Sequence, residues 1–350
     1  MGGGIGSRFW PFSREAKPKQ FLDFFGTGHS LLRMTFDRFK KILPPENIFI
    51  VTNETYDELI KKDLPELNSS QILFEPIRRN TAPCIAYATY RIKAINPNAN
   101  IVVAPSDHLI LKEDEFISII KKALEYVENN KVLLTLGIKP SRPETGYGYI
   151  QVGEEKGNGV SKVKVFTEKP NLELAKIFYE SDEFLWNSGL FIWNVETIMQ
   201  AFRNHLPEIT NIFDQGANLF NTIAEKEFID DKFLSCPNIS IDYGVMEKVS
   251  NSCVMEADFG WSDLGTWGSL HEVSEKDDNA NAGLIGNSMF IDSSDNIVAV
   301  PTGKLAVVQG LDGYIVAESD NVLLICKKDD EQSIKTFVAN TKLKYGQEYI

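Results

Sequence analysis

The chain has 350 residues and a formal net charge of −13, from 36 Lys and Arg against 49 Asp and Glu. Surfaces that bind nucleic acid or anionic membranes carry surplus basic residues, so this composition excludes a general polyanion binder. Any phosphate-bearing ligand must therefore meet a local basic site. Hydrophobic residues make up 43% of the chain, enough for a sizeable core, and the length predicts two domains or one large domain with an appendage.

The cysteines and the apolar runs indicate the compartment. The cysteines are scattered and form no C-x-x-C pair, which argues against a disulfide framework or a structural zinc site. No run approaches the roughly 18 apolar residues of a membrane helix, and the N-terminus lacks a signal-peptide pattern. We therefore expect a cytoplasmic protein that binds neither membrane nor nucleic acid. The cysteines are Cys84, Cys236, Cys253 and Cys326.

In the first two thirds of the chain, short apolar runs alternate with longer amphipathic stretches. Runs at 48–51, 101–104 and 132–136 predict strands that are buried on both faces. Apolar residues at helical spacing over 32–43 and 116–127 predict helices that face the core. This alternation is typical of an α/β fold with a mostly parallel sheet flanked by helices.

The pattern changes after residue 275. Between 287 and 325, short β-rich runs recur about every 8 residues, and Gly, Asp, Ser or Asn stands at nearly every break. They predict a small C-terminal all-β domain, a short β-helix-like coil of stacked strands. The polar segment 275–283 is the expected linker, which divides the chain into domains at 1–275 and 284–350.

A glycine-dense segment opens the chain. Glycine lets backbone N–H groups approach an anion without a Cβ in the way, although the segment matches neither a Walker A loop nor G-x-G-x-x-G. Arg8, Arg14 and Lys19 follow within a few residues, and this clustering in an acidic chain predicts a polyphosphate cradle. A flexible start with a solvated basic face is the alternative. The segment's small residues are Gly2, Gly3, Gly4, Gly6 and Ser7.

Two carboxylates suit a metal site. Asp107 directly follows the predicted strand 101–104, and ligands of open α/β sheets bind outside the carboxyl ends of strands. An aspartate in a turn or at a helix N-cap would look the same. Asp263 is the second candidate, because Mg²⁺ takes few protein ligands and keeps positions open for phosphate oxygens.

Other polar segments permit both a structural and a functional interpretation. Asn80 or Thr81 suits a helix N-cap, which explains residues 75–83 in part and leaves Arg78 and Arg79 for function. Residues 145–149 read as a turn into a strand. Residues 186–189 place an amide beside a glycine at an expected strand start, which suits a sugar contact or a turn. Glu168-Lys169 pairs an acceptor with a cation, matching a ligand with hydroxyls and a phosphate, or is an exposed surface pair.

Taken in order, these segments resemble the sugar-nucleotide pyrophosphorylases, and most closely the bacterial mannose-1-phosphate guanylyltransferases. The resemblance spans roughly residues 1 to 270. Phe9-Trp10-Pro11 and the segment 79–83 favour the guanylyl branch over thymidylyl or uridylyl relatives. The matching segments are 2–11, 17–20, 75–76, 79–83, 105–108, 144–150, 168–170, 186–189 and 260–263.

The resemblance implies a Rossmann-like domain that forms GDP-mannose and pyrophosphate from GTP and α-D-mannose 1-phosphate with Mg²⁺. It implies catalytic roles for Arg8, Lys19, Asp107 and Asp263, the two aspartates as metal ligands, and a homodimer. The implied nucleotide-binding residues are Gly2, Gly3, Gly4, Gly6, Ser7, Arg8, Glu75, Arg79, Asn80, Thr81 and Ser106. The implied sugar-phosphate-binding residues are Tyr147, Gly148, Glu168, Lys169 and Asn187.

The chain departs from the family at both ends. Family members have an apolar strand before the glycine loop, whereas this chain begins at Met1-Gly2, so we expect a natural start further upstream. Some relatives carry a C-terminal isomerase domain that needs additional histidines. The segment after the linker is too short for one, and we expect a monofunctional enzyme.

Three alternatives remain. The nearest is the same chemistry with another base or sugar, since base choice rests on a few loop residues. A non-catalytic regulatory subunit that binds sugar nucleotides is the second, and intact Arg8, Lys19, Asp107 and Asp263 argue against it. A nicotinamide dehydrogenase is third, because no acidic residue follows the glycine loop in the required context.

Overall fold

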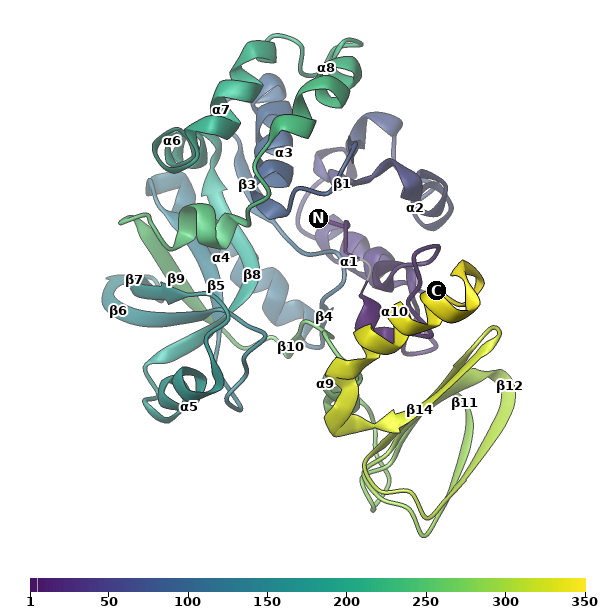
Figure 1. Cartoon of the computed structure of the whole chain (residues 1–350). Coiled ribbons are helices and arrows are strands. Elements are labelled where there is room, and N and C mark those ends of the chain that lie inside the picture. The colour runs from purple at the N-terminus through teal and green to yellow at the C-terminus, as the bar shows by residue number, and fades with distance from the viewer. Residues whose placement is uncertain (5) are drawn as a thin grey trace.

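A computed structural model describes residues 1–4 and 6–350; Ile5 of the predicted glycine loop lies outside the described residues. The core of the fold is a six-stranded sheet with strand order β3-β8-β5-β9-β7-β6 (Figure 1). Its strands are β3 (Asn100–Val103), β5 (Leu133–Ile138), β6 (Tyr149–Gly157), β7 (Val160–Thr167), β8 (Phe184–Asn194) and β9 (Ser252–Ala257).

The α/β class is confirmed, but the sheet is mixed, where the sequence indicated a mostly parallel one. β5 and β9 pair in parallel, while β8 pairs antiparallel with β3, β5 and β6. The predicted strands at 101–104 and 132–136 form as β3 and β5. The difference comes from β8: part of it, 186–189, has the composition of a turn, yet it lies inside a long strand between β3 and β5.

Helices cover both faces of this sheet. Neighbouring residues such as Leu133 and Leu134 belong to opposite hydrophobic clusters, because successive side chains of a strand point to opposite faces. One cluster packs α1 (Leu31–Lys40), α2 (Asp57–Asp63) and α4 (Glu113–Asn129) against the sheet, confirming the helices expected at 32–43 and 116–127. The other packs α3 (Thr81–Ile95), α6 (Val195–His205), α7 (Pro207–Phe213) and α8 (Glu225–Lys232).

Two small sheets lie beside the large one. β1 (Ile50–Asn53) pairs in parallel with β2 (Ile72–Glu75), and β4 (Leu109–Ile110) pairs antiparallel with β10 (Trp261–Ser262). The N-terminal backbone connects the first small sheet to the large one. Gly2 N donates to Val51 O at 2.9 Å, while Met1 N donates to Ala104 O at 3.0 Å. The glycine segment therefore starts where β1 and β3 end.

The C-terminal region is the predicted small β domain. β11 (Ala282–Ile291), β12 (Ile297–Gln309) and β13 (Tyr314–Ser319) stack in parallel, and β14 (Val322–Lys327) closes the sheet antiparallel to β13. This stack confirms the β-helix-like expectation. Residues 297–309, where the 8-residue spacing predicts more than one short strand, form one continuous strand, β12. A helix that the sequence analysis did not predict, α10 (Ile334–Tyr345), lies between these strands and the N-terminal segment (Figure 1).

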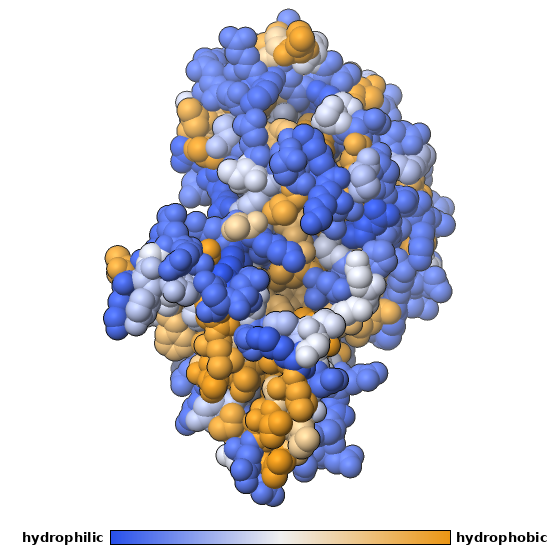
Figure 2. All heavy atoms as spheres, turned by 90° about the vertical axis from the view of Figure 1, so that its right-hand side faces the viewer, coloured by the Kyte–Doolittle hydropathy of each residue, from blue (hydrophilic) through white to orange (hydrophobic). Residues whose placement is uncertain are grey.

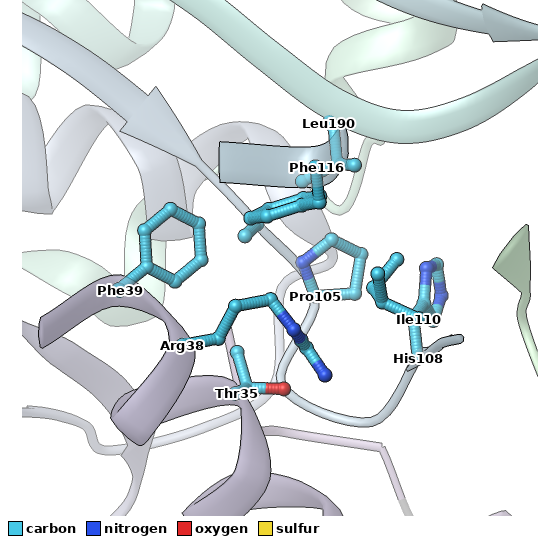
Figure 3. Close-up of a pocket in the computed structure, with 9 residues that line it drawn as sticks. Thr35, Arg38, Phe39, Pro105, His108, Ile110, Phe116 and Leu190 are labelled. Carbon is cyan, nitrogen blue, oxygen red and sulfur yellow. The ribbon is translucent and has the colours of Figure 1, made fainter. Parts of the chain in front are cut away.

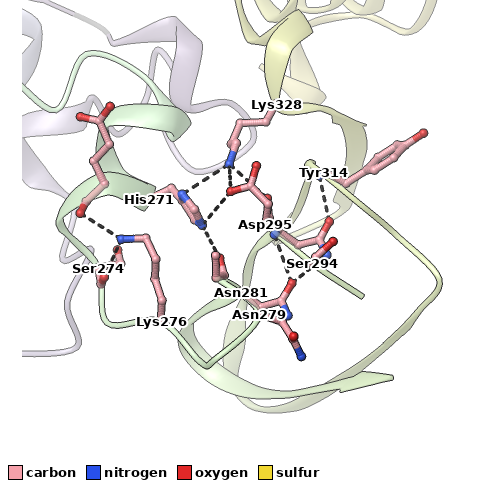
Figure 4. A network of polar contacts seen from close by, with 12 residues as sticks. His271, Ser274, Lys276, Asn279, Asn281, Ser294, Asp295, Tyr314 and Lys328 are labelled. Carbon is pink, nitrogen blue, oxygen red and sulfur yellow. Dashed lines mark hydrogen bonds and ion pairs between the residues drawn. The ribbon is translucent and has the colours of Figure 1, made fainter. Parts of the chain in front are cut away.

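One hydrophobic cluster joins the two regions. It contains Phe9 and Trp267 from the N-terminal region and Ile297 and Ile315 from the β domain. Beside it, a polar network connects α9 (Trp267–Val273) to the expected linker (Figure 4). No helix in the described part of the chain is long and apolar enough to cross a membrane.

That network is centred on His271. Its Nε2 lies 2.8 Å from Ala280 O, and Lys328 Nζ lies 3.4 Å from its Nδ1 while donating to Asp295 Oδ1 at 2.5 Å (Figure 4). Burial lowers the pKa of His271. Because Asn281 Nδ2 also donates to Ser293 O at 2.9 Å in the β domain, the segment 275–283 is held against both regions by side-chain contacts.

Candidate active site

The glycine segment is fixed by its neighbours at the end of β1. Gln20 Nε2 donates to Gly2 O at 2.8 Å, and Thr52 Oγ1 donates to the same oxygen at 3.0 Å. Gly6 has φ 74°, and a Cβ there would lie 2.5 Å from Lys19 Cβ. Glycine is thus required at position 6 for Lys19 to pack against this segment.

Lys19 joins the two candidate metal-binding residues, through the side chain of Asp107 and the backbone carbonyl of Asp263. The residue is only 4% exposed, and its Nζ lies 3.0 Å from Asp107 Oδ2 and donates to Asp263 O at 2.5 Å. Asp107 follows β3 and Asp263 follows β10, which are distant in sequence. The structure therefore brings Lys19, Asp107 and Asp263 together.

The surroundings of Asp107 favour the ionised form of its carboxyl group. Burial is the largest effect on Asp107 and opposes its ionisation, but the neighbouring positive charges, Lys19 first among them, together hold the pKa of Asp107 below its usual range. Its neighbour His108 is also buried, and burial lowers the pKa of that imidazole. Trp261 Nε1 donates to His108 Nδ1 at 3.1 Å, a bond that requires Nδ1 without a proton. His108 thus acts as an uncharged support for β10.

A small cavity of about 10 Å³ lies beneath the Asp107 loop (Figure 3). Arg38 lines it, is 4% exposed and has a buried Nε without a hydrogen-bond partner in the structure. Its guanidinium lies 5.5 Å from the Phe116 ring centroid and 3.9 Å from Glu113 Oε1, and burial lowers its pKa. A space of this size suits about one water molecule, so it is not a substrate pocket.

The larger cavity, of about 210 Å³, is lined by Asp263 and by the sugar-side residues. It lies between the N-terminus of α3, the start of β6 and the middle of β8. Residues from several separate segments reach it, which is characteristic of a ligand site in an α/β fold. The polar and charged side chains among its lining residues are Thr81, His108, Tyr147, Glu168, Lys169, Asn187, Ser188, Asp242 and Asp263.

Tyr147 connects the sugar side to the carboxylate cluster. Its hydroxyl donates to Asp263 Oδ1 at 2.7 Å, and Gly265 N donates to the same oxygen at 2.8 Å. Burial, reinforced by the Asp263 charge, raises the pKa of Tyr147, so the phenol stays protonated and orients Asp263. Nearby, a Cβ on Gly148 would lie 2.5 Å from Glu168 Oε2, so a larger residue at 148 would displace the Glu168 carboxylate.

Glu168 and Lys169 form a contact on the cavity wall. Lys169 Nζ donates to Glu168 Oε1 at 2.5 Å. Burial opposes the charge on Lys169, but the Glu168 carboxylate outweighs it and raises the pKa of the ammonium. The pair thus presents one acceptor and one fixed positive charge to the cavity.

The expected phosphate-binding arginine lies elsewhere in this structure. Arg8 Nε donates to Gln332 Oε1 at 2.9 Å, beside the start of α10. Arg14 Nη2 similarly donates to Ser319 O at 2.9 Å, in the C-terminal β domain. Of the predicted basic cluster, Lys19 therefore reaches the Asp107 carboxylate and the Asp263 backbone, while Arg8 and Arg14 contact the C-terminal region.

The remaining nucleotide-side residues surround the ends of β2 and α3. Asn80 caps α3 at φ 66°, as its sequence position predicts. Arg79 Nη2 donates to Leu234 O at 2.5 Å, and Ser106 N donates to Met1 O at 3.1 Å. Glu75 is 5% exposed, and burial raises its pKa to about 8. Its Oε1 is buried without a hydrogen-bond partner in the structure, unlike most buried polar atoms.

Asp242 was not identified from the sequence. It lies in the segment between α8 and β9, and Asn187 Nδ2 donates to its Oδ1 at 2.9 Å. No spacing or composition signal marks the segment, since Ile241-Asp242-Tyr243 reads as ordinary polar and apolar alternation. Only the tertiary contact to β8 places this carboxyl group in the cavity.

Comparison with known proteins covers the whole chain. The family described as Nucleotidyl transferase matches residues 1–280, and the MannoseP isomerase/GMP-like beta-helix domain matches residues 286–340. The mannose-1-phosphate guanylyltransferase of Escherichia coli is 35% identical over 100% of this chain and 76% of its own length. That of Salmonella montevideo is 36% identical over 100% of this chain and 74% of its own length.

A solved structure shares the architecture. The Thermus thermophilus protein described as a mannose-1-phosphate geranyltransferase aligns with a TM-score of 0.88 at 29% identity, covering 98% of each chain. Both regions of the fold therefore have a structural counterpart. With a family match over most of its length and relatives above 30% identity, this chain belongs to the nucleotidyl transferase family.

Proposed function

We propose that the chain is a mannose-1-phosphate guanylyltransferase, which forms GDP-mannose and pyrophosphate from GTP and α-D-mannose 1-phosphate. The observation that carries the proposal is that Lys19 pairs with Asp107 and with the backbone carbonyl of Asp263, and that Asp263 also lines a cavity of sugar-compatible side chains. The relatives named for this activity, 35–36% identical along the full chain, give the base and the sugar.

The chemistry requires positioning and charge neutralisation more than proton transfer. A phosphate monoester has a second pKa near 6, so the attacking oxygen of mannose 1-phosphate is already ionised at neutral pH. The protein must hold two anions in line and stabilise charge on the α-phosphate and the departing pyrophosphate. Lys19 and the N–H groups of the glycine segment would supply that stabilisation, and Arg8 would join them only by leaving its contact with Gln332.

Asp107 and Asp263 fit a Mg²⁺ ion. Mg²⁺ binds proteins through one or two carboxylates and fills its other positions with water and phosphate oxygens, which matches two carboxylates from remote segments. In the described residues no cluster of three or more His, Cys, Asp or Glu could hold a metal ion, so phosphate oxygens would complete the shell. When bound, Mg²⁺ would neutralise phosphate charge. The Tyr147 bond keeps Asp263 oriented for it.

The sugar side accommodates the hexose phosphate. Glu168 and Asn187 would bind ring hydroxyls, Tyr147 and Gly148 would shape the wall, and Lys169 would contact the sugar phosphate. On the nucleotide side, the buried Glu75 carboxyl would accept hydrogen bonds from the N–H groups of the base. Its pKa is about 8, and a protonated carboxyl group still has an oxygen that accepts a hydrogen bond. Gly2, Gly3, Gly4, Gly6, Ser7, Arg79, Asn80, Thr81 and Ser106 complete this side of the proposal.

The deciding experiment is pyrophosphate release from a matrix of nucleoside triphosphates and hexose 1-phosphates with Mg²⁺. GTP with mannose 1-phosphate should give the highest kcat/KM. A higher value for another base or sugar would favour a related nucleotidyltransferase. No release with any pair, together with measurable sugar-nucleotide binding, would favour a regulatory subunit.

We also infer a homodimer in the cytoplasm. Met289, Ile291, Leu305 and Val307 are exposed on the adjacent strands β11 and β12, and Figure 2 shows apolar side chains gathered on this lower part of the molecule. Exposed apolar patches often mark interfaces, and we assign this one to a second copy. Light scattering after gel filtration tests the dimer: Val307→Asp should shift a dimer to a monomer.

Four free cysteines support a reducing compartment.

The division into domains at 1–275 and 284–350 is likewise our proposal. The hydrophobic cluster that contains Phe9, Trp267, Ile297 and Ile315 crosses this boundary, so we expect the two regions to unfold together. A single calorimetric transition would agree with that expectation. Two separate transitions would indicate that each domain is stable by itself.

A further inference from the structure

The segment 239–247 matches none of the predicted motifs, yet it contacts both sides of the main cavity. Ile241 N donates to Thr81 Oγ1 at 2.8 Å, at the start of α3 on the nucleotide side. Glu168 N donates to Glu247 Oε1 at 3.0 Å, on the sugar side. The segment is therefore held between the two halves of the proposed site.

Within this segment, Asp242 begins a π-helical turn, Asp242–Met246. Such turns are rare and occur frequently at functional sites. The turn directs the Asp242 side chain into the cavity, which Glu168, Lys169 and Asn187 also line. The carboxyl group thus lies among the residues proposed to bind the sugar phosphate.

The hydrogen bonds of Asn187 fix how Asp242 is presented. Asn187 Oδ1 accepts from Thr135 Oγ1 at 3.1 Å and from Gly189 N at 3.2 Å, so the amide oxygen is assigned. The amide nitrogen must then face Asp242, to which it donates at 2.9 Å. A carboxyl group has about four lone-pair positions, and this bond occupies one of them. The amide nitrogen has a second N–H for a ligand.

The charges around Asp242 suit a phosphorylated ligand. Burial and the Glu168 carboxylate raise the pKa of Asp242 to about 7, against the attraction of Lys169 and the Asn187 bond. Near neutral pH the cavity therefore carries less negative charge than two ionised carboxylates would give, which weakens repulsion of a phosphate dianion. A protonated carboxyl can also donate to a hydroxyl.

We infer that Asp242 is a further sugar-binding residue. Together with Glu168 it hydrogen-bonds the ring hydroxyls of the hexose 1-phosphate, and Asn187 holds the Asp242 carboxyl group in place. The inference rests on the proposed function. It assigns Asp242 to binding and specificity, not to the bond-making step. Sugar discrimination should therefore depend on this residue.

The test pairs Asp242→Ala with mannose 1-phosphate and its 2-, 3-, 4- and 6-deoxy analogues. For the wild type, removing the contacted hydroxyl should lower kcat/KM about 10- to 100-fold, the cost of an unmade hydrogen bond to a charged partner. In Asp242→Ala the same analogue should lose less than about 3-fold, because the partner is already absent. The variant's KM for mannose 1-phosphate should rise about 10-fold or more, and its KM for GTP less than about 2-fold.

Equal losses in the wild type and the variant for every analogue would overturn the assignment, as would equal rises in both KM values. If Asp242→Ala does not fold, Asp242→Asn keeps the size of the side chain and is tested with the same analogues. Asp231→Ala, at an exposed position on α8, is the matched control and should behave as wild type. Wild-type protein without pyrophosphate release from GTP and mannose 1-phosphate would count against the proposed function, whereas an active wild type with additive losses would count against Asp242 alone.

Discussion

The sugar side and the nucleotide side of the cavity are constructed differently. On the sugar side, side chains hold one another: Asn187 fixes Asp242, and Tyr147 fixes Asp263. On the nucleotide side, the backbone of Met1 and Gly2 is hydrogen-bonded to strand ends, and Gly6 allows a close approach of Lys19. A change of functional group should thus disturb the first half, and a displacement of the backbone should disturb the second.

The junction of the two halves should give the largest effect. We expect Asp107→Asn combined with Asp263→Asn to abolish Mg²⁺-dependent pyrophosphate release, because both proposed metal carboxylates are lost. The measurement is turnover as a function of Mg²⁺ concentration. Retained Mg²⁺-dependent turnover would refute the metal assignment, and a circular dichroism melt checks that the double variant is folded.

Lys19→Met should lower kcat about 10²- to 10³-fold, the usual cost of removing one preorganised charge-stabilising group. The substitution also leaves Asp107 without its cation, so the pKa of Asp107 should rise towards its usual range or above it. Steady-state kinetics at saturating substrates tests the effect. Lys19→Arg keeps the charge and should retain more activity than Lys19→Met; near-wild-type turnover in Lys19→Met would remove its proposed role.

Adding a single methyl group should separate the two halves. In Gly148→Ala the new Cβ would lie 2.5 Å from Glu168 Oε2, and we expect the KM for mannose 1-phosphate to rise about 10-fold with little change for GTP. In Gly6→Ala it would lie 2.5 Å from Lys19 Cβ at φ 74°, and the GTP side should be affected instead. The KM values of both variants for both substrates test this. A larger effect on GTP in Gly148→Ala, together with a larger effect on mannose 1-phosphate in Gly6→Ala, would contradict the separation of the cavity into these two sides.

The smallest effect is on stability. The pKa of Asp242 is raised from 3.8 to about 7 in the folded state, so the folded protein binds more protons than the unfolded chain between these values. Stability from this group therefore falls as pH rises from about 4 to 7 and is constant above that. Asp242→Asn should remove this loss. The free energy of unfolding of the variant, relative to that of the wild type, should therefore be higher at pH 8 than at pH 4 by about 1 kcal/mol or more, since one pKa unit is about 1.4 kcal/mol.

Urea unfolding of both proteins at pH 4, 6 and 8 measures that difference. Comparison of the variant with the wild type cancels the titrating groups that do not interact with Asp242, and any change at the neighbouring Glu168 counts as part of the Asp242 effect. A difference in unfolding free energy that does not change with pH would show that Asp242 has the same pKa in both states.

Local patterns predicted the elements well where burial repeats at a regular spacing. The apolar runs of β1, β3 and β5 and the helical faces of α1 and α4 were identified because their spacing reflects which side chains face the core. β8 was identified only in part, since its middle contains Asn187 to Gly189, residues typical of turns. α10 has no marked apolar face and was missed.

The sequence by itself determined the chemistry available: a glycine segment, scattered carboxylates and basic residues, and polar groups suited to a sugar phosphate, because residue types are local properties. Only the tertiary structure decided which of them meet. Lys19 reaches both Asp107 and Asp263 while Arg8 turns to Gln332, and Asp242 enters the cavity through its bond to Asn187. Such contacts join residues tens to hundreds of positions apart, so packing of the elements, not spacing along the chain, sets them.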